Sequence, residues 1–129
     1  GYVYSLQYHL VWCTKYRKQL LKNGLDIECK RMLYELAEEY RFQILAIEVM
    51  PDHIHLLLDC KPHFFISDMI KIMKGNLARQ LFLSHPELKQ ELWGGHLWNP
   101  SYCAVTVSDR SREQVLAYIE GQKEKEKRK

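Results

Sequence analysis

The sequence lacks long apolar runs, closely spaced cysteines and a glycine-rich phosphate loop, and each absence excludes a class of protein. No apolar run among its 129 residues approaches the roughly 18 residues of a membrane-spanning helix. The four cysteines are scattered, without the paired spacing of a zinc knuckle or a redox dithiol, and are expected to be reduced. No basic and apolar leader opens the sequence. We therefore expect a cytoplasmic protein that uses neither a membrane nor a nucleotide cofactor.

The sequence also has only a small excess of positive over negative charge. The net charge is +3 and the sequence pI is about 8.6, below the pI of about 9 that usually marks a nucleic-acid-binding domain. Hydrophobic residues make up 47% of the chain and charged residues 27%, an ordinary balance for a folded domain that excludes disorder for most of the length. The length predicts a single domain over residues 1–129, with a basic tail at 123–129.

Hydrophobic periodicity divides the chain into strands and helices. The pattern predicts strands at 2–13, 42–50, 53–59 and 102–107 and helices at 25–40, 67–83 and 111–125. Pro51 and Asp52 form the turn of a hairpin, and Ser111 and Gln114 have the spacing of a capping box at the start of the last helix. This order predicts an α+β, ferredoxin-like (split βαβ, RRM-like) fold with a four-stranded antiparallel sheet and an additional C-terminal helix.

Two histidines, His53 and His55, alternate with apolar residues directly after the hairpin turn. Because successive side chains of a strand point to opposite faces, both imidazoles are expected on one face while Ile54 points into the core. A pair of neutral imidazoles on a rigid strand is half of a metal site. The competing interpretation is two packed histidines without a ligand, since histidine is often partly buried.

Tyr118 and Gln122 stand four residues apart on the predicted C-terminal helix and therefore share a face. Tyr118 is a candidate nucleophile, because a tyrosine that attacks phosphorus forms an aryl phosphodiester which a later hydroxyl can displace without a nucleotide cofactor. Gln122 is a candidate third metal ligand through its carbonyl oxygen. A tyrosine beside an apolar helix stripe is also a common packing residue, so the spacing leaves both interpretations open.

A divalent ion held by two imidazoles keeps open positions for phosphate oxygens and water. A third anchor is needed, and carboxylates near the hairpin are alternatives to Gln122: Glu48, Asp52 and Asp59. Gln122 is preferred because of its spacing from Tyr118.

Basic residues follow the first strand and occupy one side of the helix at 67–83. They are candidate phosphate contacts: Lys15, Arg17, Lys18, Lys71, Lys74 and Arg79. Aromatic residues at Trp93, Trp98 and Tyr102 suit stacking on unpaired bases, although packing explains them as well. Four further histidines have no assigned role, namely His9, His63, His85 and His96.

Several motifs along the chain together resemble one family. The most specific are Met-Pro-Asp-His-Ile-His at 50–55 and Tyr-Ile-Glu-Gly-Gln at 118–122, with further matches at 8–12, 15–17, 56–57, 74–75, 92–94 and 98–102. The chain resembles the single-tyrosine HUH transposases of the smallest bacterial and archaeal insertion sequences, the IS two-hundred and IS six-hundred-five group, nearly from end to end.

The resemblance implies a chemistry. His53, His55 and Gln122 would bind Mg²⁺ or Mn²⁺, and Tyr118 would attack single-stranded DNA to leave a 5′-phosphotyrosine and a free 3′-hydroxyl that drives strand transfer. The resemblance also implies recognition of hairpins near the transposon ends. It further implies a homodimer in which the helix with Tyr118 completes the active site of the other subunit.

Three other functions remain as alternatives. A domesticated or replication-type HUH nickase would use the same residues on different DNA ends. A non-catalytic single-stranded nucleic-acid-binding module would need a four-stranded sheet, basic loops and aromatics, but no metal. A small metal-dependent phosphodiesterase would differ from all of these by never remaining covalently attached to DNA.

Overall fold

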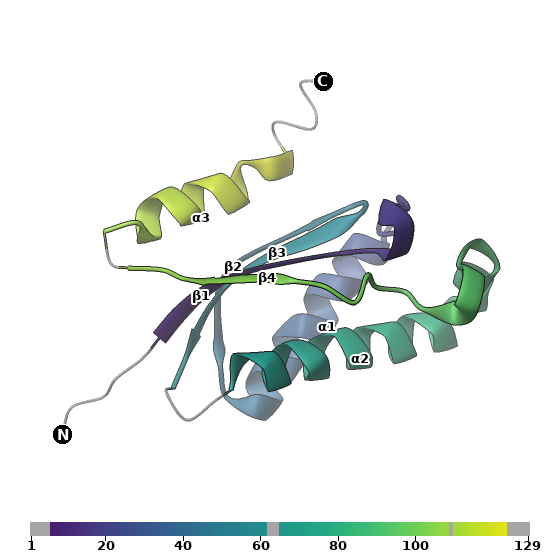
Figure 1. Ribbon diagram of the computed structural model, residues 1–129, viewed down its shortest axis with the longest axis horizontal. Coiled ribbons are helices and arrows are strands. Elements are labelled where there is room, and N and C mark those ends of the chain that lie inside the picture. The colour runs from purple at the N-terminus through teal and green to yellow at the C-terminus, as the bar shows by residue number, and fades with distance from the viewer. Residues whose placement is uncertain (1–5, 62–64, 109, 124–129) are drawn as a thin grey trace.

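The computed structural model describes residues 6–61, 65–108 and 110–123. Its main elements are β1 Leu6–Cys13, α1 Leu25–Tyr40, β2 Gln43–Met50, β3 His53–Cys60, α2 Ile66–Ser84, β4 Cys103–Thr106 and α3 Arg112–Glu120 (Figure 1). Short 3₁₀ turns lie at Lys15–Arg17, Pro86–Glu91 and Trp93–Gly95. The predicted order of strands and helices is confirmed. The first residues of the predicted opening strand and positions 124–129 of the basic tail lie outside the described residues.

The four strands form one antiparallel sheet in the order β2-β3-β1-β4. The ferredoxin-like prediction is therefore confirmed, with β1 and β3 as the two central strands. Helices α1 and α2 cover one face of the sheet, and α3 lies across the other (Figure 1). Because β3 carries the histidine pair and lies between two hydrogen-bonded neighbours, the pair stands on the most constrained part of the sheet.

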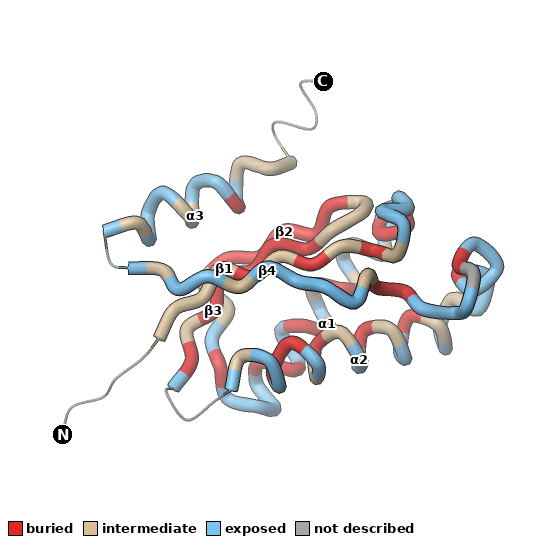
Figure 2. The backbone as a smooth tube through the Cα atoms, in the orientation of Figure 1, coloured by how far each residue is buried: buried red, intermediate tan, exposed pale blue. Residues whose placement is uncertain are grey.

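The main core lies between the sheet and the helices α1 and α2, and Figure 2 colours the buried positions of these elements red. From β1, Leu10 and Trp12 are 0% and 1% exposed, and from β3, Ile54 is 0% exposed. These residues alternate along their strands, so the predicted inward face is correct. Trp12 packs edge to face on Trp98, with ring centroids 6.0 Å apart, which attaches the segment before β4 to the core.

A second, smaller core lies beneath α3. Ala46 of β2, Leu57 of β3 and Ile119 of α3 are buried together, and Val115 and Leu116 pack against them. Leu57 is 0% exposed, although it points away from the main core. Strand β3 is thus buried on both faces. Helix α3 is held on the sheet by apolar contacts of Val115, Leu116 and Ile119, which lie on either side of Tyr118 in the sequence.

The predicted capping box at the start of α3 is wrong. Ser111 occupies the N-cap position, but its side chain makes no capping hydrogen bond because the residue already has helical dihedral angles. Its hydroxyl instead lies 3.0 Å from the Ser108 hydroxyl and donates to the Ser108 carbonyl oxygen at 3.3 Å.

Within the described residues, none of the helices has the length and apolar character needed to cross a membrane.

Candidate active site

The histidine pair lies on the face of the sheet that α3 covers. The ring centroids of His53 and His55 are 4.7 Å apart, and the rings are nearly perpendicular, at 79°. His55 is 5% exposed and His53 is half-buried. The prediction that both imidazoles share one face is therefore confirmed, and the fixed strand geometry leaves them little freedom to separate.

Asp52 of the hairpin turn fixes the ring of His53. Its Oδ1 lies 2.6 Å from His53 Nδ1, and its Oδ2 accepts a hydrogen bond from Arg17 Nε at 3.2 Å. Burial alone would raise the pKa of Asp52, but the hydrogen bond from His53 and the charges of His53 and Arg17 lower it below its usual value. An ionised Asp52 keeps the proton of His53 on Nδ1, which leaves the Nε2 lone pair as the one available to a metal.

Replacing Asp52 by Asn should weaken the metal affinity roughly tenfold, because the amide keeps the shape of the carboxylate but loses its charge. Isothermal titration with Mn²⁺ measures this. Asp59→Asn, at the far end of β3, is the matched control and should leave the affinity unchanged. Equal affinities for wild type and Asp52→Asn would show that Asp52 does not support His53.

His55 is held as a neutral imidazole. Burial, followed by the nearby His53 and His9, lowers the pKa of His55 to about 4. Its Nδ1 lies 3.3 Å from Nε2 of His9 on the neighbouring strand β1. Burial also lowers the pKa of His9. At neutral pH both rings are therefore uncharged, which is the state that metal ligation requires.

Tyr118 projects from α3 toward the histidines of its own chain. Its ring centroid is 5.5 Å from that of His55 and 6.2 Å from that of His9, both in edge-on geometry. The Tyr118 side chain remains accessible, at 44% exposure. The structure thus brings the predicted nucleophile beside the predicted metal ligands, within one chain.

The predicted helix over 111–125 is interrupted, because α3 ends at Glu120 with Gly121 as its C-cap. Gln122 therefore lies just beyond α3, four residues after Tyr118. Its Nε2 is 3.5 Å from the Tyr118 carbonyl oxygen, so in this arrangement the amide contacts α3. Among the described residues, no three His, Cys, Asp or Glu side chains are placed together to hold a metal. The two imidazoles suit a divalent ion, and the Asp52 bond to His53 is the outer-sphere support that a metal-ligating histidine usually has.

Two of the three alternative carboxylate ligands, Asp52 and Glu48, have other partners. Asp52 is hydrogen-bonded to Nδ1 of His53. Glu48 stands opposite His55 in the β2–β3 register, but its Oε1 forms ion pairs with Lys30 Nζ at 3.1 Å and Lys123 Nζ at 3.3 Å. Gln122 likewise has another contact, with the Tyr118 carbonyl oxygen.

Lys123 ties the C-terminal end of α3 to the body of the protein. Besides Glu48, its Nζ donates to Asp26 Oδ2 at 2.6 Å. Burial opposes both charges, but the contact lowers the pKa of Asp26 and, with Glu48, raises the pKa of Lys123. Since Tyr118 lies just over one turn before Lys123, this ion pair helps to position the nucleophile.

Replacing Lys123 by Met should loosen α3 without unfolding the domain. A half-exposed ion pair contributes about 1 kcal/mol, so amide exchange in α3 should become about fivefold faster while exchange in α1 is unchanged. Hydrogen exchange detected by mass spectrometry measures this, with Lys22→Met as control.

The pH dependence of α3 exchange follows from the same pair. Because the pKa of Asp26 is lowered, the stabilisation from its ion pair is fully present above pH 3.8, the ordinary pKa of the carboxyl. Because the pKa of Lys123 is raised, the same stabilisation is fully present below pH 10.5, the ordinary pKa of the ammonium. Amide exchange in α3 should therefore be slower in the wild type than in Lys123→Met between these two pH values, and the difference should disappear below or above them. A difference that vanished near pH 7 would contradict this assignment.

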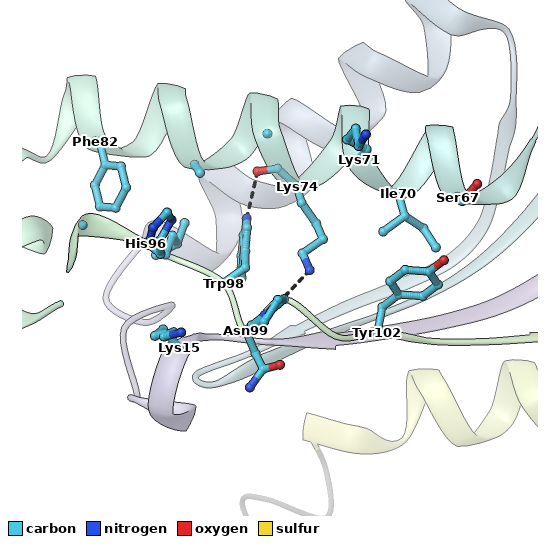
Figure 3. A pocket seen from close by; sticks show the side chains of 15 residues that line it. Lys15, Ser67, Ile70, Lys71, Lys74, Phe82, His96, Trp98, Asn99 and Tyr102 are labelled. Atoms are coloured by element: carbon cyan, nitrogen blue, oxygen red, sulfur yellow. Dashed lines mark hydrogen bonds between the residues drawn. The ribbon is translucent and has the colours of Figure 1, made fainter. Parts of the chain in front are cut away.

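A separate cavity of about 630 Å³ lies between α2 and the segment that leads into β4 (Figure 3). Three of the predicted DNA-contacting residues line it, namely Lys15, Lys71 and Lys74. Aromatic rings from Phe82, Trp98 and Tyr102 also line it. Ammonium groups beside aromatic faces are the combination that unpaired nucleotides bind.

Lys74 supports the wall of this cavity. Its Nζ donates to the Asn99 carbonyl oxygen at 2.8 Å and lies 3.4 Å from that of Ser101, while Trp98 Nε1 donates to the Lys74 carbonyl oxygen at 2.8 Å (Figure 3). Burial lowers the pKa of Lys74. The ammonium therefore holds the loop as well as adding positive charge to the cavity.

The other predicted basic contacts do not line this cavity. Arg17 is paired with Asp52, as described above, and Arg79 Nη2 donates to Asn76 Oδ1 at 2.7 Å. Lys18 is exposed after the first 3₁₀ turn. The six basic residues therefore divide into a cavity group of Lys15, Lys71 and Lys74 and three others elsewhere on the surface.

Replacing the exposed Lys71 by Gln should reduce the salt dependence of single-stranded DNA binding. Removal of one phosphate contact lowers the slope of log K against log[salt] by roughly 0.7. Fluorescence anisotropy at several salt concentrations measures the slope. Lys22→Gln, an exposed lysine away from the cavity, should not change it; identical slopes for all three proteins would remove Lys71 from the DNA-binding surface.

Sequence reasoning missed the position of His9 and the role of Lys123. Strand alternation placed His9 on the face opposite Leu10, but only the β1–β3 register shows that this face is shared with His55. The contact between Lys123 and Asp26 joins residues 97 positions apart, and no local pattern indicates it.

A ferredoxin-like sheet that carries a histidine pair beneath a tyrosine on a covering helix is the arrangement expected of a single-tyrosine HUH transposase. Comparison with known families agrees with this class. The family described as "Transposase IS200 like" matches residues 2–122. The chain therefore belongs to the IS200-like transposase family, which confirms the resemblance drawn from its motifs.

Individual relatives support this assignment. The chain is 49% identical over 126 residues to the ISDra2 transposase TnpA of Deinococcus radiodurans, covering 98% of this chain and 90% of that protein. It is 28% identical over 124 residues to the transposase for insertion sequence element IS200 of Salmonella typhimurium, covering 96% of this chain and 81% of that protein.

Solved structures show the same architecture. A crystal structure from Deinococcus radiodurans R1, described as that of a transposase, has a TM-score of 0.78 at 49% identity and covers 95% of this chain and 94% of that one. A REP-associated tyrosine transposase bound to a REP hairpin has a TM-score of 0.71 at 15% identity, covering 98% of this chain and 72% of that one. At that identity the second likeness concerns the fold alone.

Proposed function

We propose that this transposase cleaves and rejoins single-stranded DNA at insertion-sequence ends with Tyr118 as nucleophile. The Tyr118 oxygen attacks phosphorus as the phenol loses its proton, the bond from phosphorus to the 3′ oxygen breaks, and that oxygen gains a proton. The products are a 5′-phosphotyrosine and a free 3′-hydroxyl. Attack by a second 3′-hydroxyl reverses these steps and joins a new strand, so no nucleotide cofactor is consumed.

The observation that carries this proposal is the position of the Tyr118 ring beside His55. His53, His55 and Gln122 would hold Mg²⁺ or Mn²⁺, and the ion would polarise the scissile phosphate and neutralise charge that develops at phosphorus. Asp52 and Arg17 orient His53, and Lys123 holds α3 at its C-terminal end. The exposure of Tyr118 leaves its side chain accessible to a DNA strand.

Hairpin recognition and dimer formation complete the proposal. The REP-associated tyrosine transposase of the same fold is bound to a hairpin, and the cavity lined by Lys15, Lys71 and Lys74 supports binding of unpaired nucleotides by this chain. A homodimer with shared active sites and a cytoplasmic location stay predictions. In the single chain, α3 lies over its own sheet.

A non-catalytic single-strand-binding module is the second candidate, and the same lysine and aromatic cavity favours it. The two functions differ in covalent chemistry. The test incubates the protein with labelled single-stranded DNA from both flanks of its own gene, in Mg²⁺, Mn²⁺ or chelator, and separates the products under denaturing conditions. A metal-dependent protein–DNA adduct supports the transposase mechanism. Binding without an adduct at either flank, in any metal, would contradict it and favour the binding module.

A further inference from the structure

His9 contacts both the proposed metal ligand His55 and the proposed nucleophile Tyr118. It extends from β1, the central strand that pairs with β3, and its Nε2 is 3.3 Å from His55 Nδ1. The two rings are close to parallel, at 18°, with centroids 5.5 Å apart. The edge-on contact with Tyr118 at 6.2 Å places His9 against the nucleophile as well.

Two neutral imidazoles at this separation share one hydrogen bond, in which one nitrogen donates and the other accepts. If His55 binds a metal through Nε2, its proton must be on Nδ1, and His9 Nε2 must then be the acceptor. The arrangement parallels His53, whose Nδ1 is bonded to Asp52. Each of the two proposed ligands thus has its own partner on Nδ1.

We propose that His9 is a positioning residue that accepts the Nδ1 proton of His55 and thereby directs the Nε2 lone pair of His55 toward the metal. This inference rests on the proposed function. The choice of an imidazole here, rather than a second carboxylate, has an electrostatic consequence. A neutral acceptor orients His55 without adding negative charge that would repel the incoming phosphodiester.

The geometry also separates His9 from the ligands themselves. Within the part of the chain that the structure describes, His9, His53 and His55 do not form a three-residue metal cluster. His9 contacts Nδ1 of His55 and not Nε2, the nitrogen proposed to bind the metal. Its action on a metal is therefore indirect, through the tautomer and orientation of His55.

Two substitutions test this role. Gln at position 9 can place its carbonyl oxygen where His9 Nε2 lies, whereas Leu has a similar volume but no acceptor. We expect His9→Leu to lower Mn²⁺ affinity about 10- to 100-fold, and His9→Gln to restore most of it. His85→Leu, which removes a histidine bonded to Glu28, should leave the affinity unchanged.

A second measurement does not depend on metal. Nitrogen-15 NMR of the imidazoles should show the Nδ1–H tautomer of His55 in the wild type and in His9→Gln, and its loss in His9→Leu. An unchanged tautomer in His9→Leu would overturn the inference. So would a manganese hyperfine spectrum that loses one imidazole nitrogen in His9→Gln, because His9 would then be a ligand. A wild type that binds no Mn²⁺ would refute the metal part of the proposed function, while the tautomer would still decide the role of His9.

Discussion

Tyr118→Phe should abolish DNA cleavage while leaving single-stranded DNA binding close to wild type. The substitution removes only the hydroxyl, so the aromatic contacts with His55 and His9 and the packing of α3 on Leu57 remain. Loss of an attacking nucleophile typically costs four or more powers of ten in rate. Single-turnover cleavage of a flanking DNA strand measures the loss, and fluorescence anisotropy measures the binding.

The matched control is Tyr34→Phe, which removes a hydroxyl from another half-exposed tyrosine, at 50% exposure, on α1 and outside the lining of the lysine and aromatic cavity. It should cleave at the wild-type rate or near it. Cleavage by Tyr118→Phe within tenfold of wild type would show that another group attacks phosphorus. Loss of binding together with cleavage would instead indicate that the substitution disturbs the DNA-binding surface.

His55→Ala should reduce metal-dependent cleavage by about three powers of ten, because a metal supplies several kcal/mol of stabilisation to charge that develops at phosphorus. The variant loses one of the two proposed imidazole ligands and leaves His9 without its partner. Cleavage rates at increasing Mn²⁺ concentration measure the effect. A partial recovery at high Mn²⁺ is expected, since His53 and its Asp52 support remain.

Because His55 is buried, its removal also leaves a small cavity, and the effect on folding must be separated from the effect on chemistry. Thermal unfolding provides the separation. His55→Asn keeps a polar side chain in the cavity and should fold more stably than His55→Ala while cleaving no better. Cleavage by either variant at the wild-type rate, with the same Mn²⁺ dependence, would exclude His55 as a metal ligand.

The sequence was sufficient to predict the sheet and the side of the sheet on which the histidines lie. The period of two in β1 and β3 separates Leu10 and Ile54, which are buried against α1 and α2, from the histidines on the other face. The helical spacing of the last element placed Tyr118 on α3, although α3 ends at Glu120, before Gln122. These are local regularities of backbone geometry, and they survive without knowledge of the tertiary structure.

The contacts that position the site are not local, and the sequence did not reveal them. His9 reaches His55 only because β1 and β3 pair in one particular register. Lys74 is one of two lysines on α2, yet it alone donates to the loop carbonyls of Asn99 and Ser101 among the described hydrogen bonds. Such contacts depend on how distant segments pack, which periodicity does not encode.

The most direct test of the central claim is to identify the residue that becomes attached to DNA. After reaction with single-stranded DNA, digestion by trypsin and nuclease should yield residues 113–123 as a peptide with one tyrosine, Tyr118, since Arg112 and Lys123 flank it. We predict that mass spectrometry finds a nucleotide linked through its 5′-phosphate to that tyrosine. A phosphate linkage on any other residue, or cleaved DNA with no linked peptide, would contradict the proposed mechanism.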